Sequence, residues 1–129
     1  MTTHMLHHVS FGVSDLDRAA AFYDAALAPL GFVRVWTTPT GIGYGRDGGG
    51  DKFALKLTEG PTIPGRGFHL AFSAESREAV DRFHVAALLH GGSDNGAPGP
   101  RARYGPHYYA AFVIDPDGYR IEAVLNTAA

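Results

Sequence analysis

The sequence predicts an α+β fold of two tandem βαβββ units whose strands form a curved mixed sheet around a concave pocket. His8 and His69 each begin a strand-like segment, followed at matching offsets by a phenylalanine (Phe22 and Phe83) and an Ala-Ala-Leu run. The hydrophobic period also changes from strand-like to helix-like in the same order in both halves. A pattern kept at fixed spacing through both kinds of segment indicates one structural unit used twice.

The first unit is expected to span about residues 6–60. Residues 6–13 alternate between apolar side chains and polar or small ones, which is typical of a half-buried strand. Ser14 and Asp17 have the spacing of a helix-capping pair, so a helix should follow and continue to about Leu27. Three short strands complete the unit, at about 33–37, 42–46 and 52–58.

The second unit is expected to span about residues 67–126 and to repeat this order, so that residues 1–129 form one domain. The turn Asp115-Pro116-Asp117-Gly118 combines a proline that fixes φ with a glycine that tolerates positive φ, so it should close a hairpin. The other elements are predicted by periodicity: a strand at 68–73, a helix at 76–89, an irregular strand within 93–106, and hairpin strands at 108–114 and 119–125.

Composition excludes several classes of protein. The chain has 129 residues, 45% of them hydrophobic, and a formal net charge of −2, so no nucleic-acid partner is expected. No apolar run is long enough to cross a membrane, and the N-terminus has no signal-peptide pattern, so a cytoplasmic location is expected. The absence of cysteine excludes disulfides, thiolate metal ligands and a cysteine nucleophile.

The alternation of the strands predicts a metal site. His8, His69 and Glu122 fall on the face opposite the apolar side chains that should pack on the helices. Two imidazoles and one carboxylate suit a divalent ion such as Fe, Mn, Ni, Co or Zn. A lone strand histidine is more often structural, but its repetition at equivalent points of two units favours a ligand role. Small neighbours such as Ser10 leave room for a substrate.

Four other residues are candidates for the same pocket. Lys56 shares the predicted polar face, and His107 precedes a strand from which it could overhang the pocket, so both are candidate catalytic residues. Tyr108 and Phe112 have two interpretations, either ordinary core packing or a pocket wall for a flat or apolar ligand.

Three segments resemble the vicinal oxygen chelate superfamily, which includes glyoxalase I, bleomycin resistance proteins, fosfomycin-modifying enzymes and extradiol dioxygenases. They are the segment His8–Leu16 with Phe22-Tyr23, the segment His69–Phe72, and the segment Asp115–Glu122. The resemblance implies a fold of paired βαβββ units over nearly the whole chain. It also implies metal ligands on the first and last strand of each unit, which His8, His69 and Glu122 match.

The resemblance leaves two functions open. One is a divalent-metal-dependent enzyme that acts on a small molecule with vicinal oxygens. The other is a metal-free drug-binding protein of the bleomycin-resistance type, in which Lys56 would pair with Glu122. Lys56 stands where glyoxalase I has a carboxylate ligand, and Phe112 where extradiol dioxygenases have a tyrosine, which argues against both activities. Relatives often pair their units across chains, so a homodimer is expected, with a site within one chain or shared by two.

Overall fold

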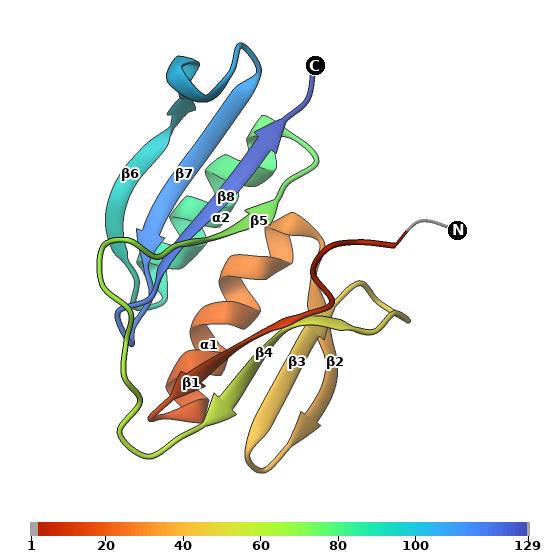
Figure 1. Cartoon of the computed structure of the whole chain (residues 1–129), viewed down its shortest axis with the longest axis vertical. Coiled ribbons are helices and arrows are strands. Elements are labelled where there is room, and N and C mark those ends of the chain that lie inside the picture. The colour runs from red at the N-terminus through yellow and green to blue at the C-terminus, as the bar shows by residue number, and fades with distance from the viewer. Residues whose placement is uncertain (1–2, 129) are drawn as a thin grey trace.

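The structure, a computed structural model, describes residues 3–128 and confirms the α+β fold of two similar units (Figure 1). Unit one comprises β1 (Val9–Val13), α1 (Leu16–Leu27), the short 3-10 helix η1 (Ala28–Leu30), β2 (Val33–Thr38), β3 (Gly41–Gly45) and β4 (Asp51–Leu57). Unit two comprises β5 (Leu70–Ser73), α2 (Arg77–Leu89), β6 (Ser93–Pro100), the 3-10 helix η2 (Ala102–Tyr104), β7 (Tyr108–Ile114) and β8 (Arg120–Asn126).

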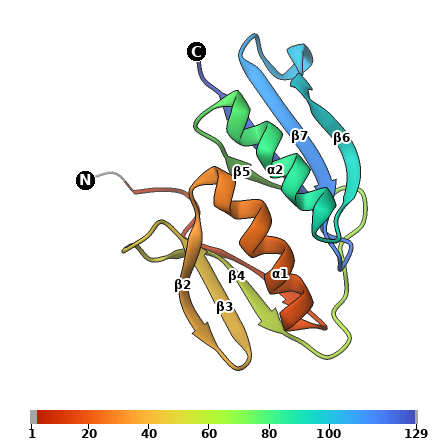
Figure 2. The ribbon, with the colours of Figure 1, turned by 180° about the vertical axis from the view of Figure 1, so that it is seen from behind.

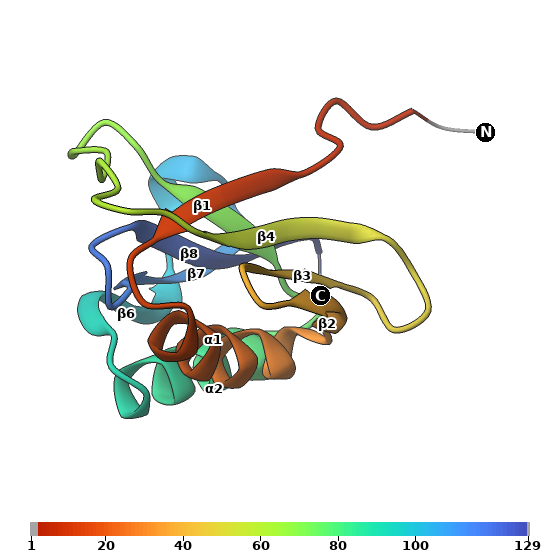
Figure 3. The ribbon, with the colours of Figure 1, turned by 90° about the horizontal axis from the view of Figure 1, so that it is seen from below.

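Each unit forms its own four-stranded mixed sheet. The strand orders are β1-β4-β3-β2 and β5-β8-β7-β6, with the first and last strand of each unit pairing in parallel. Helices α1 and α2 lie side by side and cover the same side of both sheets, which leaves the opposite faces open (Figures 2 and 3). None of the helices among residues 3–128 is long and apolar enough to cross a membrane.

One hydrophobic core runs through both units, between the sheets and the helices. The ring of Phe11 on β1 stacks on that of Tyr119, with the centroids 4.0 Å apart. Phe53 on β4 meets Phe72 on β5 edge-to-face at 5.2 Å. Aromatic pairs of this kind add to the free energy gained by burial, so apolar packing contributes to holding the units together.

Several predicted boundaries are wrong by a few residues. The strand predicted at 6–13 begins only at Val9, because the parallel ladder with β4 starts at the Val9–Phe53 pair. The cap of α1 is Asp15 instead of Ser14, and its carboxylate accepts the backbone N–H of Arg18 at 3.0 Å. By contrast, the irregular strand predicted within 93–106 is confirmed as β6, which ends at Pro100 and is followed by η2.

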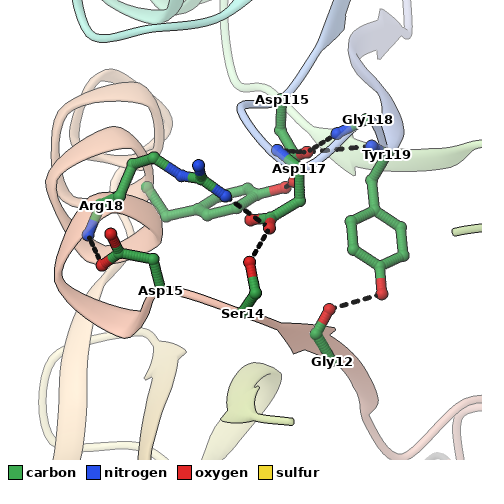
Figure 4. A network of polar contacts seen from close by, with 9 residues as sticks. Gly12, Ser14, Asp15, Arg18, Asp115, Asp117, Gly118 and Tyr119 are labelled. Carbon is green, nitrogen blue, oxygen red and sulfur yellow. Dashed lines mark hydrogen bonds and ion pairs between the residues drawn. The ribbon is translucent and has the colours of Figure 1, made fainter. Parts of the chain in front are cut away.

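The β7–β8 turn does more than close a hairpin (Figure 4). One oxygen of Asp115 accepts the backbone N–H groups of Asp117, Gly118 and Tyr119, each at 2.9 Å, and the other accepts the Tyr23 hydroxyl at 2.5 Å. Arg18 on α1 forms an ion pair with Asp117 at 2.7 Å. The turn of unit two is therefore anchored on the first helix of unit one.

Candidate functional site

The second sheet positions Glu122 at its centre. Glu122 lies on β8 between Ala71 of β5 and Phe112 of β7, its register partners on either side. Its neighbours Ile121 and Ala123 are buried in the core, so alternation along the strand directs Glu122 to the opposite, open face. Glu122 is nevertheless only 1% exposed, and an ionised carboxylate buried to this extent needs polar partners.

Two side chains supply those partners. The Nε2 atom of His69, just before β5, lies 3.0 Å from Glu122 Oε1. The hydroxyl of Tyr108, at the start of β7, donates a hydrogen bond to Glu122 Oε2. Burial, followed by the hydrogen bond and the charge of Glu122, raises the pKa of Tyr108 well above its ordinary value, so this hydroxyl remains a donor at neutral pH.

His69 opens onto a cavity with a volume of about 600 Å³. The side chain of His69 is 56% exposed, whereas that of its partner Glu122 is buried. Phe112, with its ring centroid 6.4 Å from that of His69, forms part of the cavity wall. The arrangement is a solvent-accessible imidazole fixed by a buried carboxylate at the edge of a cavity of ligand size.

His8 is not part of this group within one chain. It is exposed, its Nδ1 atom lies 2.8 Å from Nδ1 of His7, and it borders a separate groove beside Lys52 and Ala71. Among residues 3–128, no three His, Asp or Glu side chains lie close enough together to hold a metal ion. The three predicted ligands are thus split into a pair, His69 and Glu122, and the separate His8.

The remaining predicted residues lie around these positions without joining the pair. Lys56 is exposed on β4, between the register partners Gly12 and Gly41. No ion pair joins Lys56 to Glu122 in the part of the chain that the structure describes, so the predicted pairing does not form within one chain. Ser10 and His107 are exposed and lie outside the lining of the 600 Å³ cavity.

Trp36 is a prominent residue of the open face that sequence reasoning missed. It pairs with Gly43 across β2 and β3, and its indole lies so closely over Gly43 that a Cβ added to this glycine would be 2.1 Å from the indole Nε1. The alternation of glycine with Ile42 and Tyr44 along β3 was the available signal, because glycine within a strand often marks the close approach of another group.

Comparison with known proteins agrees with this architecture. The family model described as the Glyoxalase/Bleomycin resistance protein/Dioxygenase superfamily matches residues 5–123. The chain belongs to this superfamily. The match confirms the resemblance inferred from the His8, His69 and Asp115–Glu122 segments, and it leaves the reaction open, because the superfamily name itself spans several activities.

Solved structures of the superfamily share the fold along nearly the whole chain. A glyoxalase/bleomycin resistance protein from Albidiferax ferrireducens T118 is 34% identical, with a TM-score of 0.80 over 94% of this chain and 98% of the other. A glyoxalase-related enzyme from Fulvimarina pelagi is 21% identical, with a TM-score of 0.72 over 96% and 89%. The second likeness shows the fold alone. No curated protein matches the sequence.

Proposed function

We propose that this member of the superfamily is a divalent-metal-dependent enzyme that acts on a small molecule with vicinal oxygens. The observation that supports the proposal is the pairing of exposed His69 with buried Glu122 at the edge of the 600 Å³ cavity. An imidazole nitrogen and a carboxylate oxygen 3.0 Å apart are a common ligand pair for first-row metals. A metal bound there would act as a Lewis acid towards substrate oxygens.

The type of donor fits a metal, whereas the number of donors within one chain does not complete a site. His69 and Glu122 supply two ligands, and the Tyr108 hydroxyl would orient the carboxylate through its second oxygen. We propose that His8 of a second copy supplies a third ligand in a homodimer. In support, His8 is exposed, and no third His, Asp or Glu of residues 3–128 joins the His69–Glu122 pair within one chain.

Metal analysis tests this proposal. Protein purified without a chelator or a histidine tag would be soaked in Mn(II), Fe(II), Ni(II) or Zn(II), dialysed and assayed for bound metal. We expect about one ion per chain in the wild type and a loss of stoichiometric metal in Glu122→Gln and His69→Ala. His90→Ala is the matched control, because His90 is an exposed histidine at the end of α2. Wild-type protein that takes up no metal would support the metal-free binding function instead.

Screening follows if metal binds. Methylglyoxal hemithioacetal, catechols and fosfomycin represent the reactions of the relatives. Little turnover of the hemithioacetal is expected, because the exposed cation Lys56 occupies the strand position of a carboxylate ligand. A rate comparable to that of true glyoxalases would contradict this part of the proposal.

A further inference from the structure

The cavity beside His69 is lined by an unusual share of the positive charge of the protein. Four of the nine arginines line it: Arg66, Arg101, Arg103 and Arg120. They come from three separate segments: the loop before β5, the connection between β6 and η2 with η2 itself, and the first residue of β8. The chain as a whole has a net charge of −2, so this concentration is a property of one site.

The arginines elsewhere are mostly neutralised. Arg18, Arg34, Arg46 and Arg82 each form an ion pair with a carboxylate at 2.6–2.9 Å. Within residues 3–128, none of the four cavity arginines has a carboxylate within 4.0 Å, and no aspartate or glutamate lines the cavity.

Two carboxylates that neighbour lining residues in the sequence are already engaged. Glu122 is bound by His69 and Tyr108. Asp94, next to the lining residue Asn95, is bound by the His84 ring at 2.9 Å and by a backbone N–H. Within the part of the chain that the structure describes, the positive charge of the cavity is therefore not paired with a carboxylate.

The four guanidinium groups divide into a fixed one and three available ones. Arg101 donates to the carbonyl oxygens of Gly99 at 2.9 Å and Ala97 at 2.7 Å, and it lies over the Phe112 ring at 5.4 Å. Arg103 lies over the Tyr104 ring at 4.8 Å, a contact that leaves its N–H groups free to donate. Within the described chain, the guanidinium groups of Arg66 and Arg120 have no hydrogen-bond acceptor.

We propose that this cavity binds the anionic end of the substrate, a carboxylate or phosphate group, through Arg66, Arg103 and Arg120. Guanidinium groups match the paired oxygens of such anions through charge-assisted hydrogen bonds. The fixed charge of Arg101 raises the local positive potential, and the rings of Phe68, Tyr104 and Phe112 provide apolar walls. Because His69 lines the same cavity, an anion held here would place the neighbouring atoms of its molecule beside the His69–Glu122 pair.

The inference rests on the proposed function only for the part of the substrate that would lie beside the His69–Glu122 pair. The arginines can bind the anionic end of the substrate without a metal. The test is isothermal titration of succinate and phosphonoacetate, with succinamide as the neutral analogue of succinate. Each is titrated into metal-free protein and into metal-soaked protein, after dialysis to remove any chelator. We expect both anions to bind metal-free protein, more weakly at high salt, and succinamide not to bind.

The double variant Arg66→Gln/Arg120→Gln should weaken anion binding about tenfold or more, because it removes two charged donors. The matched control is Arg46→Gln/Arg82→Gln, which removes the same charge from exposed ion pairs outside the cavity. Thermal melts would confirm that both variants fold. A higher affinity for succinate or for phosphonoacetate would indicate which kind of anion the site prefers.

Three results would overturn the inference: no anion binding at millimolar concentration, equal binding of succinamide, or an equal loss in the control variant. Anion binding only in metal-soaked protein, unaffected by Arg66→Gln/Arg120→Gln, would show that the metal alone binds the anion, and would also overturn it. Arginine-dependent binding in a protein that takes up no metal would contradict the proposed metal function and leave this inference intact.

Discussion

The hydroxyl of Tyr108 hydrogen-bonds to Oε2 of Glu122, while His69 approaches the other oxygen of the same carboxylate. Tyr108 thus fixes the carboxylate from the side away from His69. We predict that Tyr108→Phe lowers metal affinity about tenfold, the usual scale for loss of a partner of a metal ligand. Competition with a metal-binding dye would measure it. Tyr104→Phe is the control, since Tyr104 lies on the cavity wall and is not among the hydrogen-bond or ion-pair partners of Glu122 in residues 3–128. An equal loss in both variants would contradict the role of Tyr108.

Mixing two variants that each lack one proposed metal ligand tests whether the metal site is shared between chains. His8→Ala and His69→Ala should each bind no stoichiometric metal. If His8 acts on the His69–Glu122 pair of a second copy, a heterodimer of the two variants contains one intact site, and mixing after partial unfolding should restore metal binding to a fraction of the sites. Metal bound per chain, before and after mixing, is the measurement. A shared site would be contradicted if both variants bound metal before mixing. It would also be contradicted if metal binding did not recover in a mixture shown to exchange subunits.

Gly43→Ala should destabilise the fold, because the new methyl group would overlap the Trp36 indole. The indole has to move or the strands have to separate, and overpacking of this kind costs about 1–3 kcal/mol. Trp36 is the only tryptophan in the chain, so its fluorescence reports the displacement directly. Chemical denaturation measures the free energy of unfolding. Gly65→Ala is the control, since a Cβ there meets no atom within 4 Å, and an unchanged Trp36 spectrum in Gly43→Ala would contradict the predicted overlap.

Tyr23→Phe should destabilise the protein at neutral pH by about 1–3 kcal/mol, because it leaves one oxygen of buried Asp115 without its donor. The control is Tyr104→Phe, which removes an exposed hydroxyl. Thermal or denaturant melts would give the difference, and a Tyr23→Phe variant as stable as wild type would show that the hydrogen bond contributes nothing.

The same tyrosine predicts a dependence on alkaline pH. Burial, followed by the charge and hydrogen bond of Asp115, raises the pKa of Tyr23 well above its ordinary value. A raised folded-state pKa gives stability that is complete below the unfolded-state pKa of about 10 and is lost progressively as the pH rises above it. Wild-type stability should therefore fall above about pH 10, and the fall should be shallower in Tyr23→Phe. Parallel curves for the two proteins would contradict this assignment.

Local pattern was sufficient to predict the two units, their order and the shared strand face of His69 and Glu122. Alternation along β8 places Glu122 on the face opposite Ile121, and the repeat places His69 on the same face as Glu122. In the structure, the side chains of His69 and Glu122 lie 3.0 Å apart. The degree of burial of Glu122 was not predictable, because it depends on Tyr108 of a neighbouring strand. Strand pairing is set by the tertiary fold, so such partners are not marked by sequence spacing.

The arginine cluster could not be predicted from the sequence for a related reason. Arg66, Arg101, Arg103 and Arg120 lie in loops, in a short 3-10 helix and at a strand end, where no periodicity assigns a face. The repeat identified His8 as the equivalent of His69, but it did not predict that His8 lies apart from the His69–Glu122 pair. A repeat shows that two units are equivalent and does not show how they are arranged relative to each other. The anchoring role of Asp115 was likewise hidden within an ordinary turn sequence.

Tyr119 stacks on Phe11 and also donates its hydroxyl to the backbone carbonyl of Gly12 at 2.7 Å. One side chain of the second unit thus supplies both an apolar and a polar partner to the first strand of the first unit. Either half expressed alone would expose this aromatic surface to water and lose the partner of a carbonyl group. The two units are therefore expected to unfold together in one cooperative transition, despite their internal symmetry.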